Sequence, residues 1–123
     1  MKMDDKKKIE LLFEEGKSKY LNAEYFDAHE VWEDLWSDYY LPDRKLVQGL
    51  IQLSVSLVHL NNGNLKGAKS LLIKSKEKFA QFEKTDRPIN LKLLKRELIS
   101  LENEYEKIHD PKDFDWSLAP RIE

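Results

Sequence analysis

The sequence predicts an all-α protein, folded as a single compact bundle of about five antiparallel helices with an irregular C-terminal tail packed back on it. Apolar residues recur along the 123-residue chain with the period of a helix, and no run alternates like a β-strand. Charged residues make up 36% of the chain, which fits amphipathic helices with solvated outer faces. The predicted connections are short, and short connections favour antiparallel neighbours.

Helices are predicted first over residues 4–20 and 23–39. Apolar residues at helical spacing define the earlier one, although Gly16 lowers its helical propensity. A short connection leads to the later one, which carries a cluster of aromatic residues. Pro42 then favours the start of a third helix over residues 43–60, because proline is tolerated in the first turn of a helix.

Two further helices are predicted over residues 65–82 and 90–108, and together they would form a helical hairpin over residues 64–108. The run Asn-Asn-Gly-Asn at residues 61–64 has the composition of a helix C-cap followed by a turn. Pro88 marks the break between the two helices of the hairpin. Each of these helices is thus bounded by residue types that end or begin helices.

The predicted tail, residues 110–123, begins with Asp-Pro and shows no helical period. It is nevertheless rich in apolar side chains, namely Phe114, Trp116, Leu118 and Ile122. Because such side chains are poorly suited to a solvated segment, we expect the tail to fold back onto the bundle or onto a partner. With this tail included, residues 1–123 have the size of one domain.

Composition argues against several classes of function. The chain has no cysteine, which excludes disulfides, cysteine-type zinc sites, iron–sulfur clusters and thiol catalysis. Its 21 basic and 23 acidic residues leave a net charge of −2, which argues against binding to nucleic acid phosphates. Its polar start does not resemble a signal peptide, and its longest apolar stretch is too short to span a bilayer. We therefore expect a cytoplasmic protein that binds neither nucleic acids nor membranes.

One group of residues in the second predicted helix combines charge, imidazole and large aromatic rings. His29 and Glu33 are four residues apart, so they share one face of the helix, and Trp36 falls on the same face. Tyr25 and Phe26 project close to this line. The spacing His-x-x-x-Glu lets two side chains reach one metal ion, whereas zinc takes three or four protein ligands.

The third predicted helix can supply the groups that this cluster lacks. It is apolar nearly all round, as is typical of a buried helix, yet Gln48, Gln52 and His59 align in one narrow stripe. Burying amides and an imidazole without partners costs about 1–3 kcal/mol each, so the stripe is expected to face polar side chains. We therefore expect a divalent transition metal to be held by His29, Glu33 and His59. The expected lining of a ligand pocket is Tyr25, Phe26, Trp36, Gln48 and Gln52.

The stretch 25–36, Tyr-Phe-Asp-Ala-His-Glu-Val-Trp-Glu-Asp-Leu-Trp, resembles the prokaryotic family catalogued as domain of unknown function 309. The hallmark of this family is His-x-x-x-Glu-x-x-Trp, matched here by His29, Glu33 and Trp36. Residues 48–53 and His59 are similar to its second block, so that the resemblance covers about residues 11–72 and leaves out the tail. The resemblance implies an all-helical cytoplasmic protein with metal binding proposed for its His/Glu motif, and no established activity.

Two interpretations of function remain open at this point. In the first, the cluster binds a metal ion or a small ligand, and a metal-bound water would be the nucleophile if the site is catalytic. In the second, the cluster is a structural hydrogen-bond network, and the protein is a non-enzymatic domain that binds a partner protein or a second copy of itself. The sequence shows no nucleophile with a base beside it and no glycine-rich phosphate loop. It therefore favours binding over catalysis.

Overall fold

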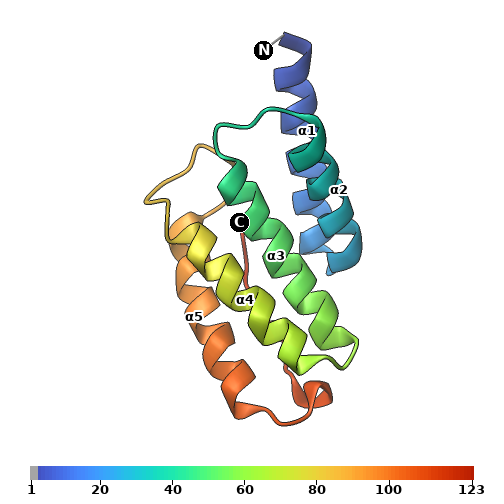
Figure 1. The fold of residues 1–123 in the computed structure, drawn as a ribbon, viewed down its shortest axis with the longest axis vertical. Helices are drawn as coiled ribbons and strands as arrows, with labels where there is room; N and C mark the ends of the chain where they lie inside the picture. The colour runs from blue at the N-terminus through green and yellow to red at the C-terminus, as the bar shows by residue number, and fades with distance from the viewer. Residues whose placement is uncertain (1–2) are drawn as a thin grey trace.

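Five α-helices and two short 3₁₀ turns make up the computed structural model, which describes residues 3–123 (Figure 1). The elements are α1 (Met3–Leu21), α2 (Tyr25–Asp38), α3 (Arg44–Asn61), α4 (Leu65–Phe79), α5 (Leu91–Lys107), η1 (Pro111–Asp113) and η2 (Trp116–Leu118). The predicted all-α class is confirmed, and no strand occurs within the described residues. None of these helices is both long enough and apolar enough to cross a membrane.

The fourth helix is shorter than the sequence predicts, since α4 ends at Phe79 and not at residue 82. The backbone N–H of Ala80 still donates to the carbonyl of Lys76, and the chain then turns. The carbonyl of Phe82 accepts a hydrogen bond from the side chain of Lys95 in α5. The last apolar residue of the predicted helix thus belongs to the connection between α4 and α5.

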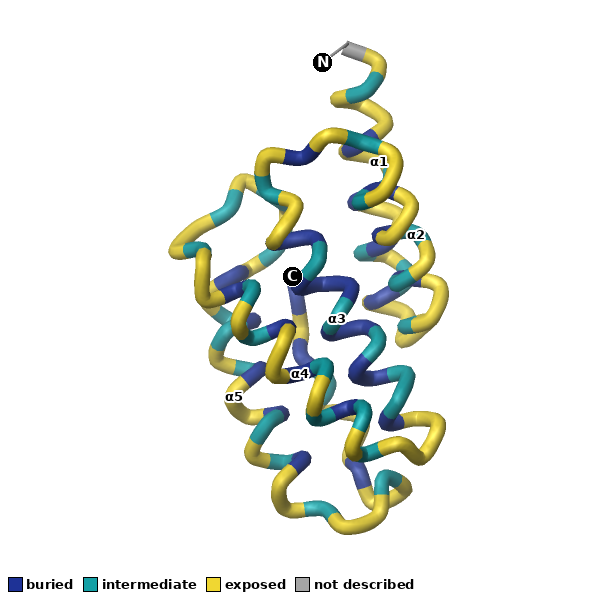
Figure 2. The backbone as a smooth tube through the Cα atoms, in the orientation of Figure 1, coloured by how far each residue is buried: buried dark blue, intermediate teal, exposed yellow. Residues whose placement is uncertain are grey.

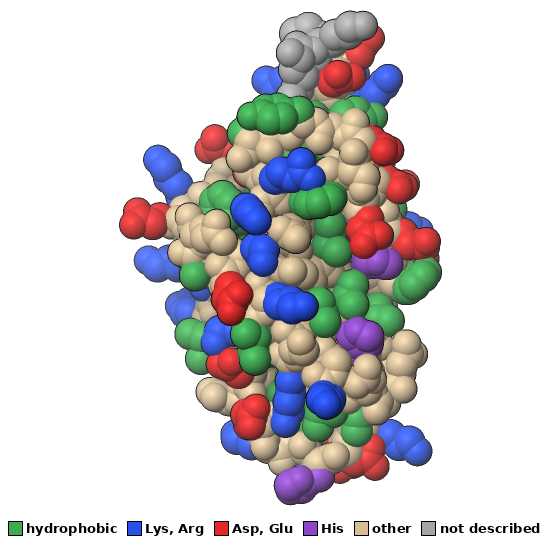
Figure 3. Space-filling view, in the orientation of Figure 1, with side chains coloured by type: hydrophobic (Ala, Val, Ile, Leu, Met, Phe, Trp, Pro, Cys, Tyr) green, Lys and Arg blue, Asp and Glu red, His purple; other side chains and the backbone are tan. Residues whose placement is uncertain are grey.

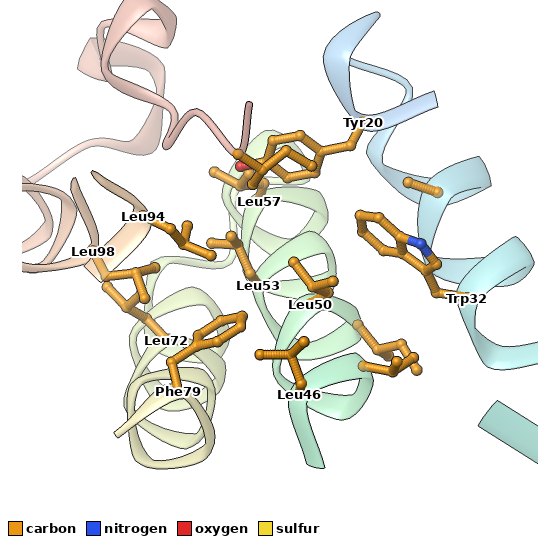
Figure 4. Close-up of a cluster of buried hydrophobic side chains, with 14 of the residues drawn as sticks. Tyr20, Trp32, Leu46, Leu50, Leu53, Leu57, Leu72, Phe79, Leu94 and Leu98 are labelled. Carbon is orange, nitrogen blue, oxygen red and sulfur yellow. The ribbon is translucent and has the colours of Figure 1, made fainter. Parts of the chain in front are cut away.

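Helix α3 forms the centre of the bundle, between the α1–α2 hairpin and the pair α4 and α5 (Figure 1). Its backbone is buried along most of its length (Figure 2). Leucines at helical spacing point from α3 into the core, where they meet side chains of the surrounding helices (Figure 4). The fully buried leucines of this helix include Leu46, Leu50, Leu53 and Leu57. A surface that is apolar nearly all round thus makes α3 the buried helix, as its sequence predicts.

The buried polar groups of α3 join it to the helices packed against it. The hydroxyl of Ser56 lies 2.7 Å from the carbonyl oxygen of Ala68 in α4 and 2.9 Å from the hydroxyl of Tyr105 in α5. The hydroxyl of Ser75 in α4 donates to the carbonyl of Gly49, at 2.8 Å. These hydroxyls are buried and paired, so they hold α3 in register without the cost of unsatisfied polar atoms.

The tail packs back on the bundle, as predicted. The side chains of Phe114 and Ile122 are buried, whereas Trp116 keeps 38% of its surface exposed. The hydroxyl of Tyr20 in α1 donates to the carbonyl of Pro120 at 2.6 Å, and this bond is buried. These contacts fix the tail against helices from both halves of the chain.

Aromatic rings form a continuous chain through the interior, from α1 and α2 across the tail to α5. Centroids of neighbouring rings are between 5.0 and 6.2 Å apart, within the range of favourable aromatic contact. In order along this chain, the rings are those of Phe13, Trp32, Tyr20, Tyr25, Trp116, Phe114 and Tyr105. The tail is therefore joined to the helices by its aromatic side chains as well as by backbone hydrogen bonds.

Candidate ligand-binding site

The helical spacing of His29 and Glu33 brings their side chains together on α2. Nε2 of His29 lies 3.3 Å from Oε1 of Glu33, and the imidazole side chain is 18% exposed. Nδ1 of His29 lies 3.2 Å from the backbone carbonyl oxygen of Phe26. Both neighbours of the imidazole are hydrogen-bond acceptors. The pair is fixed in position by its own helix.

His59 is in a different place, in the last turn of α3. Its Nδ1 lies 3.3 Å from the side-chain amide nitrogen of Asn64, which caps the start of α4. Among residues 3–123 no three His, Asp or Glu side chains are grouped closely enough to hold a metal ion. His59 follows Gln52 by seven residues, which is about 10 Å along a helix axis. His59 is therefore not grouped closely enough with His29 and Glu33 to complete the predicted metal site, although it aligns with Gln48 and Gln52 in projection.

Three of the predicted pocket residues, Trp36, Gln48 and Gln52, line one groove together with Glu33. We call this the α2–α3 groove. Its volume is about 380 Å³, and Leu71 of α4 forms part of its wall. The remaining lining residues are Ser37, Ile51 and Val55. Gln48 and Gln52 of α3 thus share one groove lining with Glu33 and Trp36 of α2.

Two residues that line the α2–α3 groove each carry a buried polar atom with no hydrogen-bond partner among the described residues. The two atoms are Nε1 of Trp36, which is a donor, and Oε1 of Gln52, which is an acceptor. Leaving such an atom unpaired costs about 1–3 kcal/mol, and nearly all buried polar groups in proteins are paired. This groove is therefore the part of the described chain where hydrogen-bonding capacity is left unused.

The indole ring of Trp36 is held in place by a cation. The guanidinium carbon of Arg44, the first residue of α3, lies 3.9 Å from the centroid of this ring. This is the geometry of a cation–π contact, which orients the ring while the guanidinium stays exposed. The sequence does not predict this contact, because no periodic pattern relates Arg44 to Trp36. In the sequence, Arg44 is only a charged residue near the start of a helix.

The other two predicted pocket residues, Tyr25 and Phe26, line a separate groove. It has a volume of about 590 Å³ and lies between the start of α2 and the end of α3. Trp116 of the tail also lines it and stacks on Tyr25, with ring centroids 5.9 Å apart. Phe26 remains 55% exposed. The apolar character of the tail predicts that Trp116 packs against the bundle. It does not predict which helix the ring contacts.

Comparison with known proteins connects the α2–α3 groove to a family. Residues 13–71 match the family described as Domain of unknown function (DUF309), and this segment contains α2, α3 and all lining residues of the groove. No curated protein and no solved structure matches the chain. The matched family is the one that the His-x-x-x-Glu-x-x-Trp stretch resembles.

Proposed function

We propose that the protein binds a small polar molecule in the α2–α3 groove. The observation that carries this proposal is the presence of one unpaired donor and one unpaired acceptor, Nε1 of Trp36 and Oε1 of Gln52, in the same groove. A ligand with an acceptor for the indole N–H and a donor for the amide oxygen would satisfy both. The groove has a volume of about 380 Å³ and is lined mainly by apolar and amide side chains. It therefore suits a small molecule.

A purely structural network has less support at this place. In such a network the polar side chains would satisfy one another, as Ser56 and Tyr105 do at 2.9 Å elsewhere in the core. Unpaired buried atoms lower the stability of the folded state, and proteins keep such local conflicts mainly at functional sites. The contrast between the paired core and the unpaired groove favours binding.

Metal binding has support from two side chains only. His29 and Glu33 offer two potential ligands at 3.3 Å from each other, and structural or catalytic zinc sites use at least three protein ligands. A partner protein, the other interpretation, is favoured by the exposed ring of Phe26 and the partly exposed ring of Trp116 in the second groove. This second candidate concerns a separate surface and can be tested apart from the first.

The substitution Gln52→Leu separates ligand binding from a structural role. It removes the unpaired acceptor at similar side-chain volume, so the free energy of unfolding is expected to rise by about 1 kcal/mol. Ligand binding should be lost in the same variant. Urea titration followed by far-UV circular dichroism measures the first effect. Binding is followed through the indole N–H signals of protein labelled with ¹⁵N-tryptophan, during titration with small amides and alcohols.

The matched control is Ser56→Ala, which removes a buried hydroxyl that is paired at 2.7 and 2.9 Å. This control should lower the free energy of unfolding by about 1 kcal/mol. A loss of similar size in Gln52→Leu would mean that the glutamine belongs to a structural network, and the proposal would fail. Trp36→Phe assigns the Trp36 signal, because this indole N–H resonance is absent from the spectrum of the variant.

A further inference from the structure

We propose that the ligand of the α2–α3 groove is a small zwitterion whose cationic and anionic groups lie about one helical turn apart, roughly 5–6 Å. This inference rests on the function proposed above and specifies the chemistry of the ligand. It follows from the charges of the two helices that flank the groove and from the order of donors and acceptors along it.

The groove lies between helices of opposite charge. Helix α2 contains five Asp or Glu residues and no Lys or Arg, whereas α4 contains five Lys residues and one Glu. Figure 3 shows acidic side chains along the edge formed by α2 and basic side chains gathered over α4. Between them, the groove exposes amide and apolar side chains. A molecule in this groove therefore sits in an electric field set by both helices.

The end of the groove near the α2–α3 connection carries donors and positive charge. Helices α2 and α3 run antiparallel, so Trp36, late in α2, lies at the same end as Arg44 and Gln48, early in α3 (Figure 1). Nε1 of Trp36 is the unpaired donor, and the guanidinium of Arg44 stacks on the same ring at 3.9 Å. No carboxylate within the described part of the chain forms an ion pair with Arg44. This end suits a carboxylate.

The next turn along the groove carries acceptors and negative charge. Glu33 lies one turn before Trp36 on α2, and Gln52 lies one turn after Gln48 on α3. Oε1 of Gln52 is the unpaired acceptor, and the carboxylate of Glu33 is 54% exposed beside it in the groove lining. One oxygen of this carboxylate, Oε1, lies 3.3 Å from Nε2 of His29. This turn suits an ammonium group, which has only donors.

The distance between the two ends sets the spacing of the ligand charges. Trp36 follows Glu33 by three residues and Gln52 follows Gln48 by four, which corresponds to about 4.5 and 6 Å along the helix axes. In an α-amino acid both charged groups are attached to one carbon, which is too short for this span. An ω-amino acid with a three-carbon spacer reaches both ends. A simple carboxylate or amine would leave one of the two buried polar atoms unpaired.

The test is a titration of ¹⁵N-tryptophan-labelled protein with four probes of matched size or charge. The probes are 4-aminobutanoate, butanoate, butylammonium and glycine. We expect 4-aminobutanoate to shift the Trp36 indole signal and to bind at least about tenfold more tightly than each of the other three. Equal affinity for butanoate or butylammonium would overturn the two-charge inference, and equal affinity for glycine would overturn the spacing.

Two variants check which end of the ligand meets which side chain. Arg44→Gln should weaken 4-aminobutanoate and butanoate and leave butylammonium unchanged. Glu33→Gln should weaken 4-aminobutanoate and butylammonium and leave butanoate unchanged. The control is Asp34→Asn, which removes an exposed charge of α2 that does not line the groove and should change none of the affinities. If both variants weaken butanoate, or both weaken butylammonium, the inference is overturned.

The result also distinguishes this inference from the proposed function. If neutral amides or alcohols shift the Trp36 signal and 4-aminobutanoate does not, the groove binds a polar ligand and the zwitterion is excluded. If neither class of probe shifts the signal, both proposals fail.

Discussion

Gly16 of α1 and Trp32 of α2 occupy complementary space at the interface of the first hairpin. An ideal Cβ atom on Gly16 would lie 2.3 Å from Nε1 of Trp32, closer than any side chain can remain. The indole fills this space and donates to the backbone carbonyl of Phe13 at 3.2 Å. The residue that lowers the helical propensity of α1 is therefore the one that allows α2 to approach it.

The substitution Gly16→Ala is expected to lower the free energy of unfolding by about 1–3 kcal/mol, because the added methyl group overpacks the interface. Helical propensity alone would favour alanine by about 1 kcal/mol, so the sign of the effect distinguishes packing from propensity. Urea titration gives the value. The control is Ser18→Ala, an exposed position of the same helix, which should be neutral or slightly stabilising. A Gly16→Ala protein more stable than the wild type would contradict the interface described here.

Tyr20→Phe tests the attachment of the tail. The change removes the hydroxyl that donates to Pro120 and leaves a buried carbonyl oxygen without this partner, so we expect a loss of about 1 kcal/mol. Limited proteolysis should cut the tail faster in the variant, since its local opening becomes easier. Tyr40→Phe is the matched control, because Tyr40 is 75% exposed. Equal cleavage rates in both variants would show that the hydrogen bond from Tyr20 does not limit the opening of the tail.

The ion pair of Asp43 and Arg87 predicts a loss of stability in acid. Burial by itself would raise the pKa of the Asp43 carboxyl, but hydrogen bonds and charge from Arg87 outweigh this, and the pKa is lowered from 3.8. Arg87 donates to both oxygens of the carboxylate, at 2.7 and 2.8 Å. The contribution of the pair is therefore complete above the unfolded pKa and disappears as the pH falls through the lowered folded value. Unfolding titrations between about pH 6 and pH 2 should show the wild type and Asp43→Asn converging in acid.

Tyr105 predicts a loss of stability at the alkaline end of the pH range. Burial raises the pKa of its hydroxyl from 10.0 to about 12, and the hydrogen bond with Ser56 offsets this only in part. The folded protein thus favours the neutral form, so this contribution is complete below about pH 10 and is lost as the pH rises to about 12. A Tyr105→Phe protein should lose less stability over this interval. In a pH titration followed by tyrosinate absorbance, the variant should lack one tyrosine that ionises at high pH.

The fold could be predicted because it depends on patterns that repeat over many residues. The apolar period, the glycine and proline breaks and the all-round apolar surface of α3 each act over a whole helix, and each is found in the structure. The end of α4 is not marked by such a pattern, and the segment that follows it contacts α5 through a hydrogen bond from the side chain of Lys95 to the carbonyl of Phe82. Contacts of that kind join residues with no periodic relationship, so the sequence does not indicate them.

The sequence predicts the direction in which each side chain of the candidate site points from its helix. It does not predict which of these side chains lie close together along the helix axis. Projection places Tyr25, Phe26 and Trp36 near one line, yet Tyr25 and Trp36 are eleven residues apart, or about 16 Å along α2. They therefore line different grooves, which the sequence treats as one pocket. The contact of His29 with Glu33 was predictable because one helical turn fixes both its angle and its distance.

The docked tail has a consequence for the order of folding. The hydrogen bond from Tyr20 to Pro120 joins residues 100 positions apart, whereas the four contacts between helices that follow one another in the chain close short loops. Loop closure costs more entropy as the loop lengthens, so the helices assemble first and the tail docks on a bundle already formed. The groove that Trp116 completes beside Tyr25 is therefore the last surface of the molecule to appear and the first to be lost.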